Sequence, residues 1–213
     1  MKKVIFTVAA IFAFGFANAQ ETKMETPSSS GSFAKGDIFM SGSIGYEGES
    51  EGDVKLNKFN FMPRIGFFVS DNIAIGAQFG YEGSTNENIY DVTFDDNAKV
   101  TTNELSIGAF GRYLFTPSNQ FSFYTELGLT YLSRTEERDF DTELDYEIKS
   151  PGFEVAFRPG VNYFISNNFA LEASVGVLRY ETNKPDYAGA DSRDTFELGF
   201  NLSDINFGLL YKF

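Results

Sequence analysis

Residues 205–213 read Ile-Asn-Phe-Gly-Leu-Leu-Tyr-Lys-Phe, and the alternation in this stretch decides the fold. Every second position is apolar, and most of these positions are aromatic: Ile205, Phe207, Leu209, Tyr211 and Phe213. The positions between them are small or polar, apart from Leu210. Because successive side chains of a β-strand point to opposite faces, this stretch predicts a strand with one apolar face.

The same two-residue period recurs in seven stretches upstream. We expect strands near residues 38–46, 59–69, 73–81, 105–115, 121–131, 153–163 and 169–177. Short turns around Asp71, Ser118 and Asn167 alternate with long polar stretches. We expect these polar stretches to be loops, at residues 47–55, 83–102, 134–149 and 181–195. Residues 63–81 and 159–177 align without a gap, which indicates a duplicated hairpin within a meander.

The two faces of these strands differ in what they can bury. One face carries bulky aliphatic and aromatic side chains. The other carries glycines among a row of polar residues, which includes Arg64, Gln78, Arg112, Glu126, Glu154, Arg158 and Glu172. A soluble eight-stranded barrel would turn its apolar face inward, but eight bulky rows overfill such a lumen. We therefore expect the apolar face outside, against lipid. The predicted fold is all-β, an eight-stranded antiparallel up-and-down transmembrane β-barrel.

The first 35 residues differ in composition from the rest. Lys2 and Lys3 precede an apolar run that ends in Ala17-Asn18-Ala19, so residues 1–19 are predicted to be a signal peptide. A membrane-spanning helix needs roughly 20 apolar residues, which is more than this run provides. Residues 20–35 are mostly polar and are expected to be a flexible segment. The barrel domain is then expected over residues 36–213.

Several motifs in combination resemble one protein family. They are the signal peptide, the repeated hairpin residues 68–76 and 164–172, Gly111-Arg112-Tyr113, and the terminal Tyr211-Lys212-Phe213. With the alternating strands, they make residues 36–213 similar to small bacterial outer-membrane β-barrels, which are porin-like or similar to the transmembrane domain of outer-membrane protein A. The resemblance implies a place in the cell outer membrane, with lipid and lipopolysaccharide as partners. It also implies that the barrel-assembly machinery reads Tyr211 and Phe213 as a terminal signal.

The polar row predicts an ionic network inside the lumen. If the short turns pair their flanking residues tightly, Arg64 lies across from Gln78, and Arg112 lies diagonal to Glu126. Such a network can plug the barrel, which suits a structural or surface-interaction role. It can also form a charged constriction, which suits a narrow porin-like channel for small solutes. Buried charges need partners in either case.

An acidic row in the third polar stretch suggests two readings. The odd positions are Asp139, Asp141, Glu143, Asp145 and Glu147, which share a face if the neighbouring strands extend this far. Carboxylates could bind Ca²⁺ or Mg²⁺. The alternative is a solvated acidic surface loop with no metal, and we expect this second reading and no cofactor.

The composition argues against most enzymes. The chain has no histidine and no cysteine, so it lacks an imidazole base, a thiolate nucleophile and the usual zinc ligands. An acid-pair protease needs carboxylates alone, but no Asp-Thr-Gly-like context supports one. The net charge of −13 over 213 residues argues against nucleic acid as a partner. We therefore expect a non-enzymatic protein, and the sequence does not identify a partner for its polar loops.

Overall fold

The computed structural model describes residues 31–91, 96–140, 146–176, 178–199 and 205–213. The predicted signal peptide and residues 20–30 lie outside this part of the chain. The described residues form ten strands: β1 (Ile38–Glu51), β2 (Val54–Phe68), β3 (Ile73–Asp91), β4 (Asp96–Leu114), β5 (Phe121–Phe140), β6 (Tyr146–Phe164), β7 (Phe169–Val175), β8 (Leu178–Asn183), β9 (Arg193–Leu198) and β10 (Ile205–Lys212). No described helix is long and apolar enough to cross a membrane.

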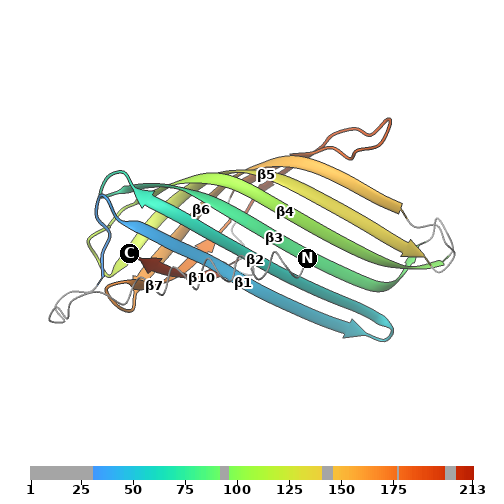
Figure 1. The fold of residues 1–213 in the computed structure, drawn as a ribbon, viewed down its shortest axis with the longest axis horizontal. Helices are drawn as coiled ribbons and strands as arrows, with labels where there is room; N and C mark the ends of the chain where they lie inside the picture. The colour runs from blue at the N-terminus through green and yellow to red at the C-terminus, as the bar shows by residue number, and fades with distance from the viewer. Residues whose placement is uncertain (1–30, 92–95, 141–145, 177, 200–204) are drawn as a thin grey trace. The chain divides into compact units, whose positions relative to one another are not determined.

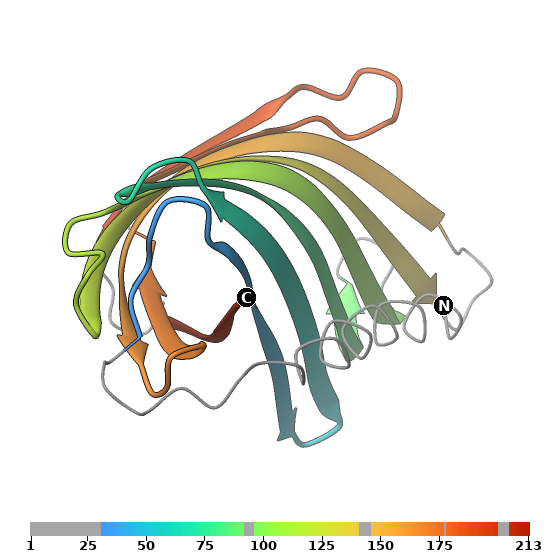
Figure 2. The same cartoon turned by 60° about the vertical axis from the view of Figure 1, so that its left-hand side comes forward.

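Eight of these strands close into an antiparallel ring. The order β5-β4-β3-β2-β1-β10-β7-β6 returns to its start because β5 also pairs with β6. Figure 1 shows β1 to β5 lying side by side, and Figure 2 shows the strands curving round toward β10. The predicted eight-stranded β-barrel is confirmed. Closure leaves no open sheet edge where the first and last strands meet, at Phe39 to Gly42 against Lys212 to Leu209.

The strands are longer than the apolar alternation predicts, and the prediction of long loops was wrong for three of the four polar stretches. In the fourth, residues 184–192 between β8 and β9 do form a loop. β3 and β4 pair as far as Asp91 and Asp96, and β5 and β6 pair as far as Arg138 and Tyr146. Most of the polar stretches at residues 47–55, 83–102 and 134–149 therefore continue the sheet. Beyond the lipid both faces of a strand can meet water, so its residues are polar on both sides while the backbone ladder continues. Apolar alternation cannot detect such a strand.

The fourth polar stretch forms a separate hairpin with a change of register. β6 pairs with β7 at Gly160 and Ser174, but pairs with β8 at Phe157 and Leu178. One extra residue therefore lies between β7 and β8, as in a β-bulge, and this reverses which residue numbers face the lumen. β9 pairs with β8 and completes the hairpin.

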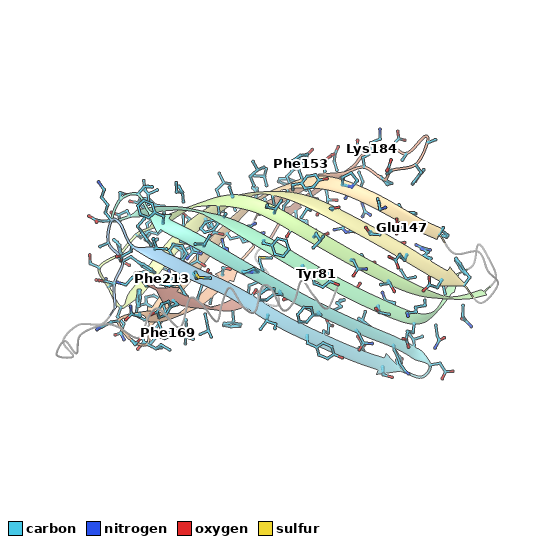
Figure 3. All side chains as sticks on the ribbon, viewed as in Figure 1. Tyr81, Glu147, Phe153, Phe169, Lys184 and Phe213 are labelled. Atoms are coloured by element: carbon cyan, nitrogen blue, oxygen red, sulfur yellow. The ribbon has the colours of Figure 1, made fainter. Side chains whose placement is uncertain are left out.

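The faces of the barrel are as the parity predicted. Large apolar side chains on the outer face are exposed, such as Ile107 at 63%, Leu127 at 57% and Leu171 at 47%. The lumen face instead buries a compact cluster, composed of Phe33, Phe39, Phe68, Ala74, Phe110, Leu114, Tyr124, Phe164, Ala170 and Leu210. In Figure 3, Phe169 marks the end with the short turns, Glu147 lies toward the opposite end, and Tyr81 and Phe153 lie between them. We call these two ends the turn end and the loop end.

Candidate functional site: the ion quartet in the lumen

Four charged side chains from four strands meet inside the barrel. They are Arg64 on β2, Arg112 on β4, Glu126 on β5 and Glu172 on β7, and we call them the ion quartet. Arg112 lies 2.8 Å from Glu126 and 2.6 Å from Glu172, measured between its Nη atoms and the carboxylate oxygens. Arg64 donates a hydrogen bond to Glu126 and lies 3.6 Å from Glu172. Two positive and two negative charges therefore compensate one another across the lumen.

The quartet is almost fully removed from water. The side chains of Arg112 and Glu126 are 1% and 2% exposed, and those of Glu172 and Arg64 are 8% and 11% exposed. Aromatic rings surround the guanidinium groups. Arg112 lies 3.9 Å above the centre of the Tyr124 ring, and Arg64 lies 4.3 Å from that of Phe110. These cation–π contacts add attraction where solvent is excluded.

Glycines on the lumen face make room for these rings. A Cβ added at Gly160 would collide with the Tyr124 ring, and one at Gly66 would collide with Phe39. The rings can therefore pack directly against the backbone of the barrel wall. An eight-stranded barrel has a lumen just wide enough for side chains, so rings and ion pairs together fill this level of it.

The structure corrects one predicted pairing and qualifies another. Arg112 lies directly opposite Glu126, and not diagonal to it as expected. The reason is a longer turn: Phe115 pairs with Phe123, while Ser122 bonds back to Thr116 and lengthens the connection by two residues. Gln78 does lie across from Arg64 in the sheet, but its amide donates to Thr130 Oγ1, 2.8 Å away, and not to a charged group.

Glu154 and Arg158, which were placed in the same network, belong to a second group nearer the loop end. Glu154 binds Arg158 at 2.9 Å and Arg179 at 2.6 Å, and Arg179 also pairs with Glu181. Arg134 lies 3.6 Å from Glu181 and completes what we call the upper ion group. Its three arginines, Arg134, Arg158 and Arg179, are 24–37% exposed. The arginines of the upper ion group therefore reach solvent, whereas the Glu154 and Glu181 side chains are 10% and 7% exposed. Sequence reasoning missed Arg179 and Glu181 because the bulge before β8 turns odd residues inward.

A third layer lies beneath the quartet at the turn end. Phe33, Phe39, Phe68 and Phe164 are each at most 3% exposed, and the Phe33 ring stacks on Phe68 with centroids 4.7 Å apart. Phe33 lies within residues 20–35, which were expected to be flexible. Its described end, residues 31–35, instead packs against the barrel. The available signal was a lone phenylalanine in an otherwise polar stretch.

The acidic row on the outside contains few described residues. Asp141, Glu143 and Asp145 lie outside the described part of the chain. Asp139 faces Lys99 across β4, and Glu147 accepts a hydrogen bond of 2.8 Å from Lys149. That bond raises the pKa of the Lys149 ammonium above its usual value. Among the described residues, no three acidic side chains are grouped so that they could hold a metal ion.

The predicted assembly-signal residues lie at the last strand. Tyr211 pairs with Phe169 across β7, and their ring centroids are 4.8 Å apart. β10 ends at Lys212, and Phe213 is 49% exposed. Whether another protein reads this aromatic residue remains a prediction.

Comparisons with known proteins agree on the fold. A family model described as "Outer membrane protein beta-barrel domain" matches residues 6–213. The crystal structure of OprG from Pseudomonas aeruginosa superimposes with a TM-score of 0.53 at 12% identity, covering 85% of this chain and 98% of that chain. Ail of Yersinia pestis gives 0.42 at 14% identity, with 84% and 99% covered. The likeness to OprG is one of fold. No curated protein sequence matches.

Proposed function

This chain belongs to the outer membrane protein beta-barrel domain family, and from that premise we propose that it is a barrel closed to solutes, with a structural or surface-interaction role. The observation that carries this proposal is the ion quartet. An ion that crossed the lumen would have to separate charges that are 1–11% exposed and mutually neutralised. Breaking one buried pair costs about 3–5 kcal/mol. A cost of this size lowers the population of an opened lumen by roughly 10²–10⁴-fold.

The surface role draws on the extended hairpins. β3 to β6 each contain 19 or 20 residues, whereas a tilted strand needs about 9–11 to cross the lipid. The excess carries polar side chains beyond the bilayer on two pairs of strands. These hairpins can contact a partner outside the cell, and the polar edge can meet lipopolysaccharide. The acidic residues near their ends keep this surface solvated.

Export and insertion complete the proposal. Residues 1–19 would direct secretion and be removed, and the barrel-assembly machinery would recognise Tyr211 and Phe213 at the terminal strand. Neither step needs a cofactor or an enzymatic activity of this chain. Lipid contacts the outer face, whose large apolar side chains are exposed in every strand from β1 to β7.

Planar-bilayer conductance tests the closed barrel. We expect wild-type protein, purified and shown to be folded by its heat-dependent gel mobility, to pass little or no current. Reproducible ion-selective openings would refute the plug and favour the alternative, a narrow porin-like channel. One observation supports that alternative: the arginines of the upper ion group are 24–37% exposed, so charged groups near the loop end are in contact with solvent. A channel would additionally need the quartet to rearrange.

A further inference from the structure

We propose that residues 31–37 form a stopper that seals the turn end of the lumen, separately from the ion quartet. The proposal rests on the closed barrel argued above and adds a second barrier in series with the first. The wall itself begins with β1 at Ile38, so this segment is not part of it. A piece of chain that fills the mouth without forming the wall can in principle leave it.

Phe33 is the central side chain of this stopper. Its side chain is 3% exposed and contacts rings from three different strands: Phe68 at 4.7 Å, Phe164 at 4.8 Å and Phe39 at 6.1 Å between centroids. These partners come from β2, β6 and β1. β1 and β2 are neighbours in the ring, and β6 lies on the opposite side of it. Phe33 therefore fills the centre of the mouth and does not merely extend one wall. Removing it would leave the other three rings without their common neighbour.

Polar contacts from the last strand and from two short turns hold the segment around Phe33 in place. Lys212 Nζ donates to the Ser32 carbonyl at 2.5 Å and lies 3.4 Å from the Asp37 carboxylate. The Phe33 amide donates to the Pro117 carbonyl at 2.9 Å, and the Lys35 amide donates to Asp71 at 2.9 Å. Pro117 and Asp71 belong to two of the short turns. The segment is thus tied to the last strand and to separate turns.

The local sequence suits a return of the chain over the mouth. Gly36 has a φ of +95°, a left-handed conformation that costs glycine little and most other residues more. Its amide bonds to the Phe68 carbonyl at 2.9 Å, where β2 ends. The Ala34 amide donates to the Asp37 carboxylate at 2.9 Å, which closes the bend. The chain can therefore cross the opening and then turn sharply into β1.

Single cysteines test the stopper, because the chain has none of its own. Ala170→Cys places a thiol on the lumen face of β7 at a position that is fully buried in the cluster containing Phe33. Ser174→Cys places one on the same face of the same strand, beyond Glu172 on the loop side. A polar maleimide is added to folded protein in detergent micelles. We expect Phe33→Ala to raise the labelling rate of the Ala170 probe at least about tenfold by local opening, and to leave the Ser174 probe unchanged.

Lys212→Met provides a second variant if Phe33→Ala does not fold, since it removes the two polar ties and keeps an apolar stem. Heat-dependent gel mobility shows folding in each case. If the Ala170 probe stays equally protected in the folded variants, or if both probes gain reactivity equally, the stopper is refuted. Conductance of the wild type separates this from the proposed function. A conducting wild type would overturn the closed barrel, whereas the labelling result judges the stopper alone.

Discussion

Replacing Glu126 by glutamine removes one charge from the ion quartet with little change in shape. Glu126 accepts three hydrogen bonds: one from Arg64, and two from Arg112, at 3.0 Å and 2.8 Å. After Glu126→Gln the cluster changes from neutral to a charge of +1, and an amide NH₂ faces the guanidinium groups. Breaking a buried ion pair costs about 3–5 kcal/mol, and we expect about 3 kcal/mol because Glu172 still compensates Arg112 and Arg64 can reach some water.

Urea unfolding in lipid vesicles measures this loss, followed by far-UV circular dichroism because the chain has no tryptophan. The matched control is Glu136→Gln on the same strand and face. Glu136 pairs with Arg138 at 2.8 Å, but its side chain is 32% exposed, so its pair is worth below about 1 kcal/mol. The expected ranking is a large loss for Glu126→Gln, together with increased leakage of ions, and a small loss for the control. Equal losses would mean that the quartet is solvated and that the reasoning is wrong.

Three further predictions concern the lipid-facing wall, two glycines of the barrel and the C-terminal residue. Leu127→Arg places a charge on the exposed outer face and should lower the free energy of unfolding in vesicles by roughly 2–4 kcal/mol. Thr135→Arg lies farther along β5, beyond the lipid, and should lower it by about 0–1 kcal/mol. The reverse order in urea titrations would contradict this placement of the bilayer. Gly76→Ala should cost about 1–3 kcal/mol because its Cβ would collide with the Ile65 carbonyl oxygen and the Phe110 ring. Gly111→Ala should be nearly neutral because its Cβ meets nothing within 4 Å, and similar melting temperatures for the two variants would argue against close packing at Gly76. Phe213→Ala should lower the outer-membrane yield in cells while refolding normally in detergent, and a normal yield would dismiss the terminal signal.

The strand order and the facing of side chains could be predicted because lipid imposes a two-residue period. Inside the bilayer the outer face must be apolar, so residues such as Leu127 and Leu129 reveal their orientation by chemistry alone. The same constraint places Arg112 and Glu126 in the lumen. Alternation no longer reveals the facing of side chains where the strands leave the lipid. Past the lipid the strands are polar on both faces, so the sequence looks like a loop although the backbone remains paired.

Other features could not be predicted because they depend on small local shifts. The extra residue before β8 turns Arg179 and Glu181 inward, whereas a continued alternation would place these odd-numbered residues on the outer face. The longer turn held by Ser122 moves Arg112 directly opposite Glu126. Phe33 packs because three rings from distant parts of the chain leave room for a fourth. No local pattern carries that information, since it exists only once the ring of strands has closed.

The excess length of the strands also sets how far the protein extends beyond the lipid. β5 has 20 residues, and with about 9–11 of them in the lipid, the remaining nine or so rise about 20 Å when tilted at roughly 45°. A hydrogen-bonded ribbon holds this height more rigidly than a loop of equal length would. Whatever lies at its outer end is therefore presented at a fixed distance from the headgroups. Shortening β5 and β6 by matched pairs of residues would lower that height in steps of about 5 Å without changing the membrane-embedded wall.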